Sequence, residues 1–498
     1  MAIYALFFGL IPSVLSQTKA SFRWSEFQKV NKYSQAVFIF KYDNGYGVII
    51  KSDPKFNANL YKFRLSIYDE NLKFKRNSTI GINKYKERVI DIWSHKNQIY
   101  FLTQIELPLQ RVAARLRIFK TTNVTDSVIS HDIILLTKTH FDRNPSFHIG
   151  RKDSSVSIWY SNPPEKEDAS QSITSLTYTL EMKPLDKAVI DLPKKAELCK
   201  VYRVENLESG QFLIYTKEYA VRPIEKRGFS PNYQFVFYVS NPNTTTLKYR
   251  VLKNEEAYLE RGRLKWNKGI LEATGLFTYK LEGPKMGLWY FKHDFNSNTL
   301  LMDTIQPFNK DIKSLPTNGF QSSLMRYSRL ESFYLDYFIK LDSSRRIIVA
   351  EQFFLLPAAI GSSYTYNRFY GDIMLLYLNA QGEIYQGKRL IKAQQTYNNY
   401  GEYSSYYLER KDSVLQFFFN DHYKNRNFYR YKHLVWHRQS SLVLQEVTQN
   451  RVIKTTLALY NQVDGILQVR DMLPLSPGHY LVYANKNKKG KLGVMKLE

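Results

Sequence analysis

The feature of this sequence that most constrains its fold is a pattern of short strands and tight turns that recurs along the chain. The pattern is clearest over 372–420, which reads DIMLLYLNAQGEIYQGKRL and, after a Tyr-rich loop, YSSYYLERKDSVLQFFFND. The apolar and aromatic run at 373–378 has no helical cap, which is typical of a well-buried strand. An Asn-Ala-Gln-Gly turn and a return strand follow over 379–390, and a second hairpin covers 406–419. The sequence therefore predicts one antiparallel sheet unit of four strands that recurs.

The same pairs of hairpins can be followed through most of the chain. The 372–420 element completes the sixth unit and begins the seventh. In chain order, the expected strands are 37–42, 47–51, 60–68, 72–80, 89–93, 98–103, 114–120, 126–136, 147–151, 155–160, 172–182, 188–192, 199–204, 211–215, 234–239, 245–252, 262–266, 270–278, 287–293, 299–304, 333–341, 346–354, 373–378, 383–390, 406–410, 414–419, 431–438, 442–453, 469–473, 479–483 and 492–496.

Units of four strands at intervals of roughly 50–80 residues are typical of β-propeller blades. Three strands are left at the C-terminus and one candidate, 22–30, near the N-terminus. Their pairing would close a ring and remove its exposed edges. The prediction is an all-β protein: one β-propeller domain over 17–498 with eight four-stranded blades, or seven as the alternative. Two stacked β-sandwich domains remain a rival, because short alternating strands alone do not distinguish them. The best helix candidate is 254–264.

Composition supports a folded β protein and gives a weak indication of its partners. Aromatic residues make up 15% of the chain, with 38 Tyr and 31 Phe, and such residues favour strands. Lys and Arg number 71 against 45 acidic residues, a net charge of +26 that predicts attraction to polyanions such as lipopolysaccharide, acidic glycans or nucleic acid. The basic residues do not form one block, so a solvated basic surface is the alternative. No specific nucleic-acid motif is present.

The N-terminus predicts export. Residues 4–16 form an apolar run too short to span a bilayer, with small residues near its end, as in a signal peptide cleaved to leave Gln17. A buried first strand is the alternative, since no Lys or Arg precedes the run. No other stretch is long enough for a membrane helix. Cys199 is the only cysteine, so no internal disulfide can form, and it is interpreted as a small buried hydrophobe.

The connections predict where binding would occur. In a propeller, first-to-second and third-to-fourth turns lie on one face, and all other connections lie on the opposite face. The second group includes five long connections at 161–171, 220–232, 306–326, 357–371 and 391–402. Rigid scaffolds carry binding residues on such loops, and Tyr with Asn and Arg suits a protein or sugar partner. The candidate binding residues are Tyr364, Tyr366, Arg368, Tyr370, Tyr397, Asn399, Tyr400, Arg222 and Arg227. The alternative is that these tyrosines pack the loops onto the blades.

No motif assigns catalysis, a cofactor or a metal. His433 and His437 in HLVWH would share one side of a strand, but no third ligand has a recognisable spacing. There is no Gly-rich phosphate loop, zincin motif or nucleophile elbow. No residue is therefore predicted to be catalytic.

The strands FRLSIYDENLKFKR and DIMLLYLNAQGEIYQGKRL resemble those of large exported propeller-like proteins of Bacteroidota. The resemblance covers most of the chain as a style of strand and turn, and the leader is similar to leaders of that phylum. It implies a Gram-negative envelope or secreted location and transfers no catalytic residue. Because the chain ends on the strand-like KLGVMKLE and lacks a recognisable C-terminal sorting domain, the periplasm is favoured over the cell surface.

Together these features predict a non-enzymatic exported scaffold that binds a protein or glycan of the cell envelope through its long-loop face. The alternative is a carbohydrate-active hydrolase or lyase whose site lies in the central funnel. A cluster of carboxylates from first strands, converging on the axis, would favour the enzyme.

Overall fold

The computed structural model describes residues 19–498 with some gaps. The gaps are 31–33, 53–59, 84–86, 108–110, 121–128, 138–146, 152–153, 163, 165–167, 208–210, 222, 228–229, 242–243, 253–255, 282, 316–331, 358–365, 398–402, 423, 426–439 and 487.

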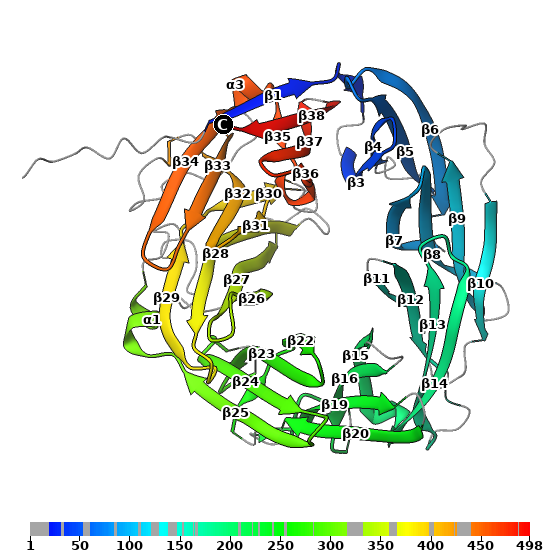
Figure 1. Cartoon of the computed structure of the whole chain (residues 1–498), viewed down its shortest axis with the longest axis vertical. Helices are drawn as coiled ribbons and strands as arrows, with labels where there is room; N and C mark the ends of the chain where they lie inside the picture. Colours follow the sequence, from blue (N-terminus) through cyan, green and yellow to red (C-terminus); the bar gives the residue numbers. More distant parts are fainter. Residues whose placement is uncertain are drawn as a thin grey trace, which may run out of the picture.

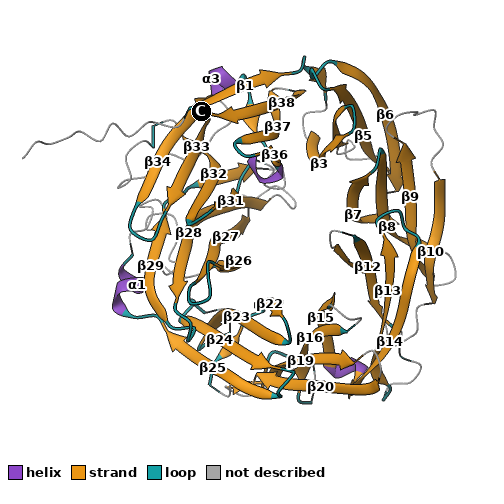
Figure 2. Ribbon diagram, viewed as in Figure 1, coloured by secondary structure: helices purple, strands orange, loops and turns teal. Residues whose placement is uncertain are grey.

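Eight antiparallel sheets stand side by side around a common axis, with the first strand of each sheet innermost (Figures 1 and 2). Blades 1 and 2 consist of β3 (Ser34–Tyr42), β4 (Gly45–Ser52), β5 (Leu60–Asp69) and β6 (Phe74–Asn83), then β7 (Glu87–His95), β8 (Gln98–Leu107), β9 (Arg111–Lys120) and β10 (Ile129–Thr137). Blades 3 and 4 consist of β11 (His148–Arg151), β12 (Ser155–Ser161), β13 (Ser170–Thr179) and β14 (Pro184–Lys195), then β15 (Cys199–Asn206), β16 (Phe212–Tyr219), β19 (Tyr233–Asn241) and β20 (Thr244–Leu252).

The second half of the ring has extra short strands. Blade 5 contains β21 (Tyr258–Leu259), β22 (Arg263–Asn267), β23 (Ile270–Thr278), β24 (Gly287–Asp294) and β25 (Thr299–Pro307). Blade 6 contains β26 (Phe333–Lys340), β27 (Arg346–Pro357), β28 (Tyr366–Leu378), β29 (Ile384–Leu390) and β30 (Gln394–Tyr397). Blade 7 contains β31 (Tyr407–Lys411), β32 (Val414–His422), β33 (Ser440–Val447) and β34 (Val452–Leu459). Blade 8 contains β35 (Ile466–Leu467), β36 (Leu473–Ser476), β37 (His479–Lys486) and β38 (Lys489–Leu497).

The two ends of the chain close the ring. Strand β1 (Ala20–Trp24) pairs with β38 from Ala20↔Leu497 to Trp24↔Gly493, and the short β2 (Gln28–Lys29) continues the pairing. Blade 8 thus takes its outermost strand from the N-terminus (Figure 1). This closure leaves β38 without an exposed edge, as the sequence predicted.

The core lies between blades rather than inside one. Eight clusters of buried residues each fill one seam between neighbouring blades, including the seam between blade 8 and blade 1. At that last seam Ile39 and Val48 pack with Leu481 and Leu492. Eight blades in an open row would have only seven seams, so the eighth cluster is the signature of the closed ring.

Asp and Asn side chains hold several of the hairpin turns. The Asp342 carboxylate accepts hydrogen bonds from the backbone N–H groups of Ser344 and Arg345, at 2.9 and 2.8 Å. The Asn379 side chain does the same for Gln381 and Glu383, at 3.0 and 2.9 Å. Such Asx turns are the physical reason that Asp and Asn mark the ends of hairpins in this sequence.

The innermost strands are irregular. In β3, β7, β15 and β26 one extra residue interrupts the register with the second strand: Val37, Ile90, Tyr202 and Asp336, respectively. In blades 5 and 8 the innermost strand is split in two. Bulges of this kind re-aim side chains and are frequent near functional sites.

The structure confirms the eight-bladed ring but corrects several local predictions. The hairpins of 372–420 do not share one sheet, because β28–β29 belong to blade 6 and β31–β32 to blade 7. The expected strand 442–453 is the β33–β34 hairpin, with a turn at 448–451. The expected strand 469–473 begins as a 3₁₀ turn, η4 (Val469–Asp471). The expected helix 254–264 contains β21 instead. The expected strand 431–438 lies outside the described residues.

The α-helices in the described part of the chain are short. They are α1 (Lys310–Ser314), where the Asn309 side chain accepts a hydrogen bond from the Ile312 N–H, and α3 (Tyr460–Val463). No helix in the described part of the chain is long and apolar enough to cross a membrane.

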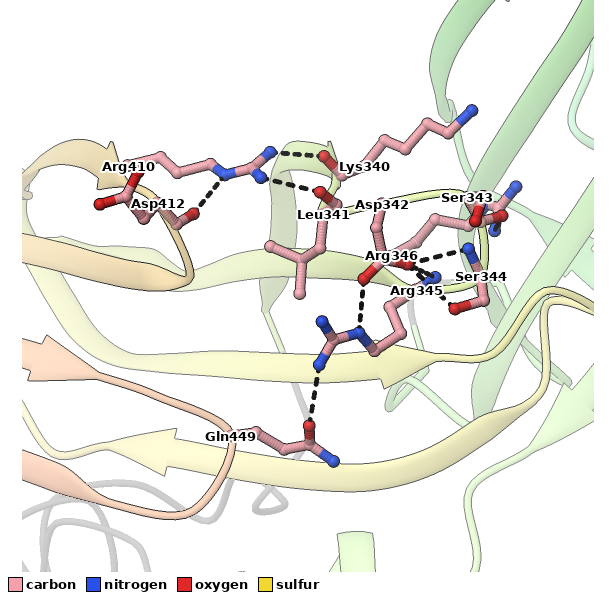
Figure 3. Close-up of polar contacts among 10 residues, drawn as sticks. All are labelled: Lys340, Leu341, Asp342, Ser343, Ser344, Arg345, Arg346, Arg410, Asp412 and Gln449. Carbon is pink, nitrogen blue, oxygen red and sulfur yellow. Dashed lines mark hydrogen bonds and ion pairs between the residues drawn. The ribbon is translucent and has the colours of Figure 1, made fainter.

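Polar contacts join the short turns of neighbouring blades, as Figure 3 shows for blades 6 and 7. The Arg410 guanidinium donates to the backbone oxygens of Lys340 and Leu341, at 2.6 and 2.8 Å. The Arg345 guanidinium reaches across to Gln449 Oε1, at 3.2 Å. These contacts fix the blades to one another on the short-turn face. The longer connections on the opposite face are therefore carried by a rigid base.

Candidate functional site

Two of the connections predicted to bind lie side by side because they pair as strands. Asn367 and Arg368, near the start of β28, are paired with Tyr397 and Thr396 of β30. The expected loops 357–371 and 391–402 are therefore partly sheet. The structure brings these two segments together on blade 6.

Tyr370, a candidate in this region, packs into the blade. It is 8% exposed, and its ring centroid lies 4.9 Å from that of Phe353. Burial raises the pKa of its phenol. Arg368 is half-buried. Tyr366, Tyr397 and Arg227 lie in β28, β30 and the small strand β17 (Lys226–Arg227), and their side chains are not among those described.

Tyr364, Asn399, Tyr400 and Arg222 lie outside the described residues. The same holds for His433 and His437. Among the described residues, no group of three or more His, Cys, Asp and Glu side chains is placed to hold a metal ion.

A cleft of about 460 Å³ opens between blades 4, 5 and 6, and we call it the blade 4–6 cleft. Glu225 and Lys285 come from the second-to-third connections of blades 4 and 5, Glu260 and Arg261 from the connection within the split first strand of blade 5, and Ser332 from the entry to blade 6. All of these segments belong to the long-loop face. The cleft therefore lies on the face that the sequence predicted for binding, although not on the predicted residues.

Four tyrosines from three blades line this cleft: Tyr202 and Tyr233 from blade 4, Tyr258 from blade 5 and Tyr334 from blade 6. Tyr202 is the bulge residue of β15, and Tyr334 is 54% exposed. The Arg261 guanidinium lies 5.1 Å from the Tyr202 ring centroid and donates to the Tyr202 backbone oxygen at 3.1 Å. Aromatic rings presented this way offer large, rigid contact faces with a polar edge.

Ion pairs occupy the cleft walls. Lys217 is paired with Glu225, and its ammonium nitrogen lies 3.6 Å from the Tyr233 ring centroid. Burial lowers the pKa of Lys217, against the opposing effect of Glu225. Lys285 is paired with Glu260 in the same way. Each carboxylate that lines the cleft is therefore paired with a lysine.

Sequence reasoning missed these residues, although a signal was present. Lys217 and Tyr219 end β16, and Glu225 follows within the long connection 220–232. The predicted residues in that connection were the cations Arg222 and Arg227. Glu225, which pairs with Lys217, is not recognisable from the sequence, because a charged side chain near the end of a strand resembles an ordinary solvated residue.

A second cleft, of about 680 Å³, lies along the first strands of blades 1 to 3, and we call it the blade 1–3 cleft. Val37 and Ile90, the bulge residues of β3 and β7, line it. Asp91 and Arg151 form an ion pair of 2.8 Å across its wall. Lys51 and Arg88 also line the cleft, and both stand near the strand ends that meet the long-loop face.

Asp336, the bulge residue of β26, belongs to a cluster of charged groups from blades 5 to 8. Its carboxylate accepts a hydrogen bond of 2.7 Å from the Tyr406 hydroxyl. Burial, and then the nearby Glu351, raise the pKa of Asp336 to about 6, while Arg263 and Arg470 act in the opposite direction. Perturbed carboxyl groups of this kind occur at functional sites and also in structural networks.

Glu351 is itself engaged. It accepts a hydrogen bond from Ser405 Oγ at 2.7 Å and forms an ion pair of 2.6 Å with Lys392. Two first-strand carboxylates, Asp91 and Glu205, are paired with arginines. These contacts do not form the convergent set of carboxylates that would favour a hydrolase.

Cys199 is buried at the seam between blades 3 and 4, and burial raises the pKa of its thiol. Thiolates, not thiols, are nucleophiles, so this residue is a packing group.

Comparisons with known proteins reveal likeness of architecture only. No protein-family model matches the chain, and no curated protein matches it. Among solved structures, it is similar to the WD40 domain of SCAP from fission yeast, at 8% identity and a TM-score of 0.38, over 95% of this chain and 98% of that one. It is similar to the β-propeller domain of the Trilobed protease from Pyrococcus furiosus, at 9% identity and a TM-score of 0.33, over 86% and 99%. It is also similar to an α-L-arabinofuranosidase from Fusarium graminearum, at 9% identity and a TM-score of 0.31, over 68% and 92%. The chain is an eight-bladed β-propeller by its own strand order and pairing.

Proposed function

We propose that this protein is an exported, non-enzymatic scaffold that binds a glycan of the cell envelope through its long-loop face. The observation that carries the proposal is the blade 4–6 cleft, where Tyr202 and Tyr233 from blade 4 and Tyr334 from blade 6 stand beside two lysine–glutamate pairs. Sugar rings pack their C–H faces on aromatic rings and hydrogen-bond through their hydroxyls, so tyrosines with fixed polar groups suit them. A protein partner is the alternative occupant of the same face. The apolar run at 4–16 supports export to the periplasm, the outer membrane or the medium.

Substitution of Tyr334 tests the proposal, because its ring is exposed and its loss should not disturb the fold. Tyr370, which is buried, would be a poor choice. Binding to an array of envelope glycans, followed by calorimetry with the best ligand, should weaken about tenfold in Tyr334→Ala. The matched control is Tyr385→Ala: Tyr385 is 43% exposed on β29, an outer strand, and its loss should leave affinity unchanged. If both variants bind as the wild type does, the cleft is not the site. Capture of an envelope protein with no glycan binding would favour the alternative partner.

A second candidate, a carbohydrate-active hydrolase or lyase on the axis, is supported by Asp336. A carboxyl group whose pKa is raised to about 6 keeps its proton in mildly acidic solution and is suited to protonate a leaving group. Release of reducing ends or unsaturated sugars from glycans, lost in Asp336→Asn and kept in Tyr334→Phe, would establish this activity. Absence of turnover on glycans that bind would exclude it.

A further inference from the structure

The two clefts have matching charge. Each is lined by three cations and two carboxylates: Lys217, Arg261 and Lys285 with Glu225 and Glu260 in the blade 4–6 cleft, and Lys51, Arg88 and Arg151 with Glu87 and Asp91 in the blade 1–3 cleft.

In both clefts the carboxylates already have partners. Glu225 and Glu260 pair with Lys217 and Lys285. Asp91 pairs with Arg151, and Glu87 pairs with Arg117, which lies on β9. The acidic groups are therefore neutralised within the protein, and each cleft keeps an excess of positive charge.

One arginine in each cleft contributes to this excess. Arg261 donates to the Tyr202 backbone oxygen, and Arg88 donates to Gln104 Oε1 at 3.3 Å. Within the described part of the chain, no carboxylate is in ion-pair contact with either guanidinium. Both residues are exposed. A guanidinium held by a neutral oxygen keeps its charge and further donors for an anion, which it binds through two parallel hydrogen bonds.

The two arginines act on one common neighbour. His148, on β11 of blade 3, stacks on Trp159 with ring centroids 4.1 Å apart. Burial lowers the pKa of its imidazole, and Arg88 and Arg261 lower it further. His148 begins β11, Arg88 stands near the start of β7, and Arg261 lies between β21 and β22, so all three residues stand where innermost strands meet the long-loop face, with His148 between the two arginines in blade order.

We infer that the long-loop face takes one extended acidic polysaccharide, bearing carboxylate or sulfate groups, that runs from the blade 4–6 cleft past His148 to the blade 1–3 cleft. Arg261 and Arg88 each bind one acidic group, while Tyr202, Tyr334 and the exposed His148 ring, which is backed by Trp159, contact sugar rings. The inference rests on the proposed glycan-binding function and adds the class of ligand and its path. The net charge of +26 favours approach of such a chain over long range.

The test is calorimetry with probes that differ in charge and length. The probes are a long oligogalacturonate, digalacturonate, a sulfated dextran, neutral dextran and single-stranded DNA. The variants are Arg88→Ala, Arg261→Ala and both together, with Arg451→Ala as the matched control, since Arg451 is exposed in a short turn on the opposite face.

Each cleft variant should bind the long acidic oligomer about tenfold more weakly, and the double variant about a hundredfold more weakly. Digalacturonate should respond to only one of the two arginines. Raising the salt concentration should weaken binding of the acidic probes alone. Thermal melts of each variant establish that it is folded.

The outcomes separate the inference from the proposed function. Equal affinity for neutral and acidic glycans, lost in Tyr334→Ala, would keep the function and overturn the acidic ligand. A loss in Arg261→Ala with none in Arg88→Ala would overturn the extended path. Tighter binding of single-stranded DNA than of any sugar would show that charge alone is recognised, and binding of none of the probes would overturn both proposals. Preference between carboxylate and sulfate is read from the oligogalacturonate and sulfated dextran affinities.

Discussion

Arg346 of blade 6 holds Glu272 of blade 5 through two contacts of 2.7 Å, one from Nε and one from Nη2. The two side chains are 1% and 10% exposed, so the pair crosses the seam between the blades out of water. Tyr290 also donates its hydroxyl to Glu272, at 3.1 Å. The geometry is the two-pronged arrangement in which arginine binds carboxylate most strongly.

Removing one partner of this buried pair should lower the free energy of unfolding far more than removing one partner of a neighbouring surface pair. In Arg346→Met the buried carboxylate keeps only the longer ion-pair contact of 3.8 Å with Lys292, and we expect a loss of about 3 kcal/mol in the free energy of unfolding. The control is Arg345→Met, which removes a solvent-accessible ion pair with Asp342 and should lower the free energy of unfolding far less. Urea unfolding followed by fluorescence measures both. Equal midpoints for the two variants would mean that the buried pair does not hold the seam.

Closure by the N-terminal strand should determine both stability and solubility. Removal of residues 1–29 would leave β38 as an unpaired edge and uncover the apolar cluster that Phe22 and Trp24 help to cover. We expect a lower melting temperature and self-association in light scattering. Removal of residues 1–18, which ends before β1, is the control and should change neither. A truncated chain that stays monomeric and melts with the control would refute this role of β1.

Gly493→Ala tests the same contact without deleting any chain. A Cβ atom at Gly493 would lie 2.2 Å from the Trp24 ring, so the ring or the strand must shift. We expect a loss of about 1–3 kcal/mol, as for other overpacked sites, measured by thermal melting. No change would indicate that Trp24 moves aside freely.

The proposed export predicts the mass of the mature chain, because a signal peptide is removed during export. If residues 1–16 are a signal peptide, the chain expressed in a Gram-negative host and recovered from the periplasm should begin at Gln17, as intact mass spectrometry would show. A retained Met1 in a cytoplasmic fraction would remove the support for an envelope ligand.

The ring could be predicted from the sequence because the features that define its strands and turns lie close together in the chain. Alternating apolar residues and Asx turns such as those at Asp342 and Asn379 appear directly in the chain, and each unit repeats them. The binding clefts could not be predicted in this way. Tyr202 and Tyr233 of blade 4 meet Tyr334 of blade 6, which is up to 132 positions away in the chain, only because both blades border blade 5. The bulges that re-aim Tyr202 and Asp336 leave no clear mark in the alternating pattern, and the neutralisation of Glu225 by Lys217 depends on how a long connection folds back.

Asp336 should make stability depend on pH in a direction opposite to that of an ordinary salt-bridged carboxylate. Its pKa is raised from 3.8 to about 6, mainly by burial. Below pH 4 the carboxyl is protonated in both the folded and the unfolded chain. Between pH 4 and 6 the unfolded chain loses this proton while the folded chain keeps it, so the free energy of unfolding falls as pH rises, by about 2–3 kcal/mol in all.

Asp336→Asn removes this titration and still offers an oxygen to the Tyr406 hydroxyl. Relative to the wild type, the variant should gain stability as pH rises from 4 to 7, measured as the difference between the two melting temperatures at each pH. Asp471, whose pKa burial also raises to about 6, is present in both proteins and therefore cancels in that difference. Asp471→Asn should show the same trend, and the double variant should show their sum if the two groups are independent. A difference that stays constant from pH 4 to 7 would mean that Asp336 is ionised in the folded protein, and with it the case for an axial acid catalyst would be lost.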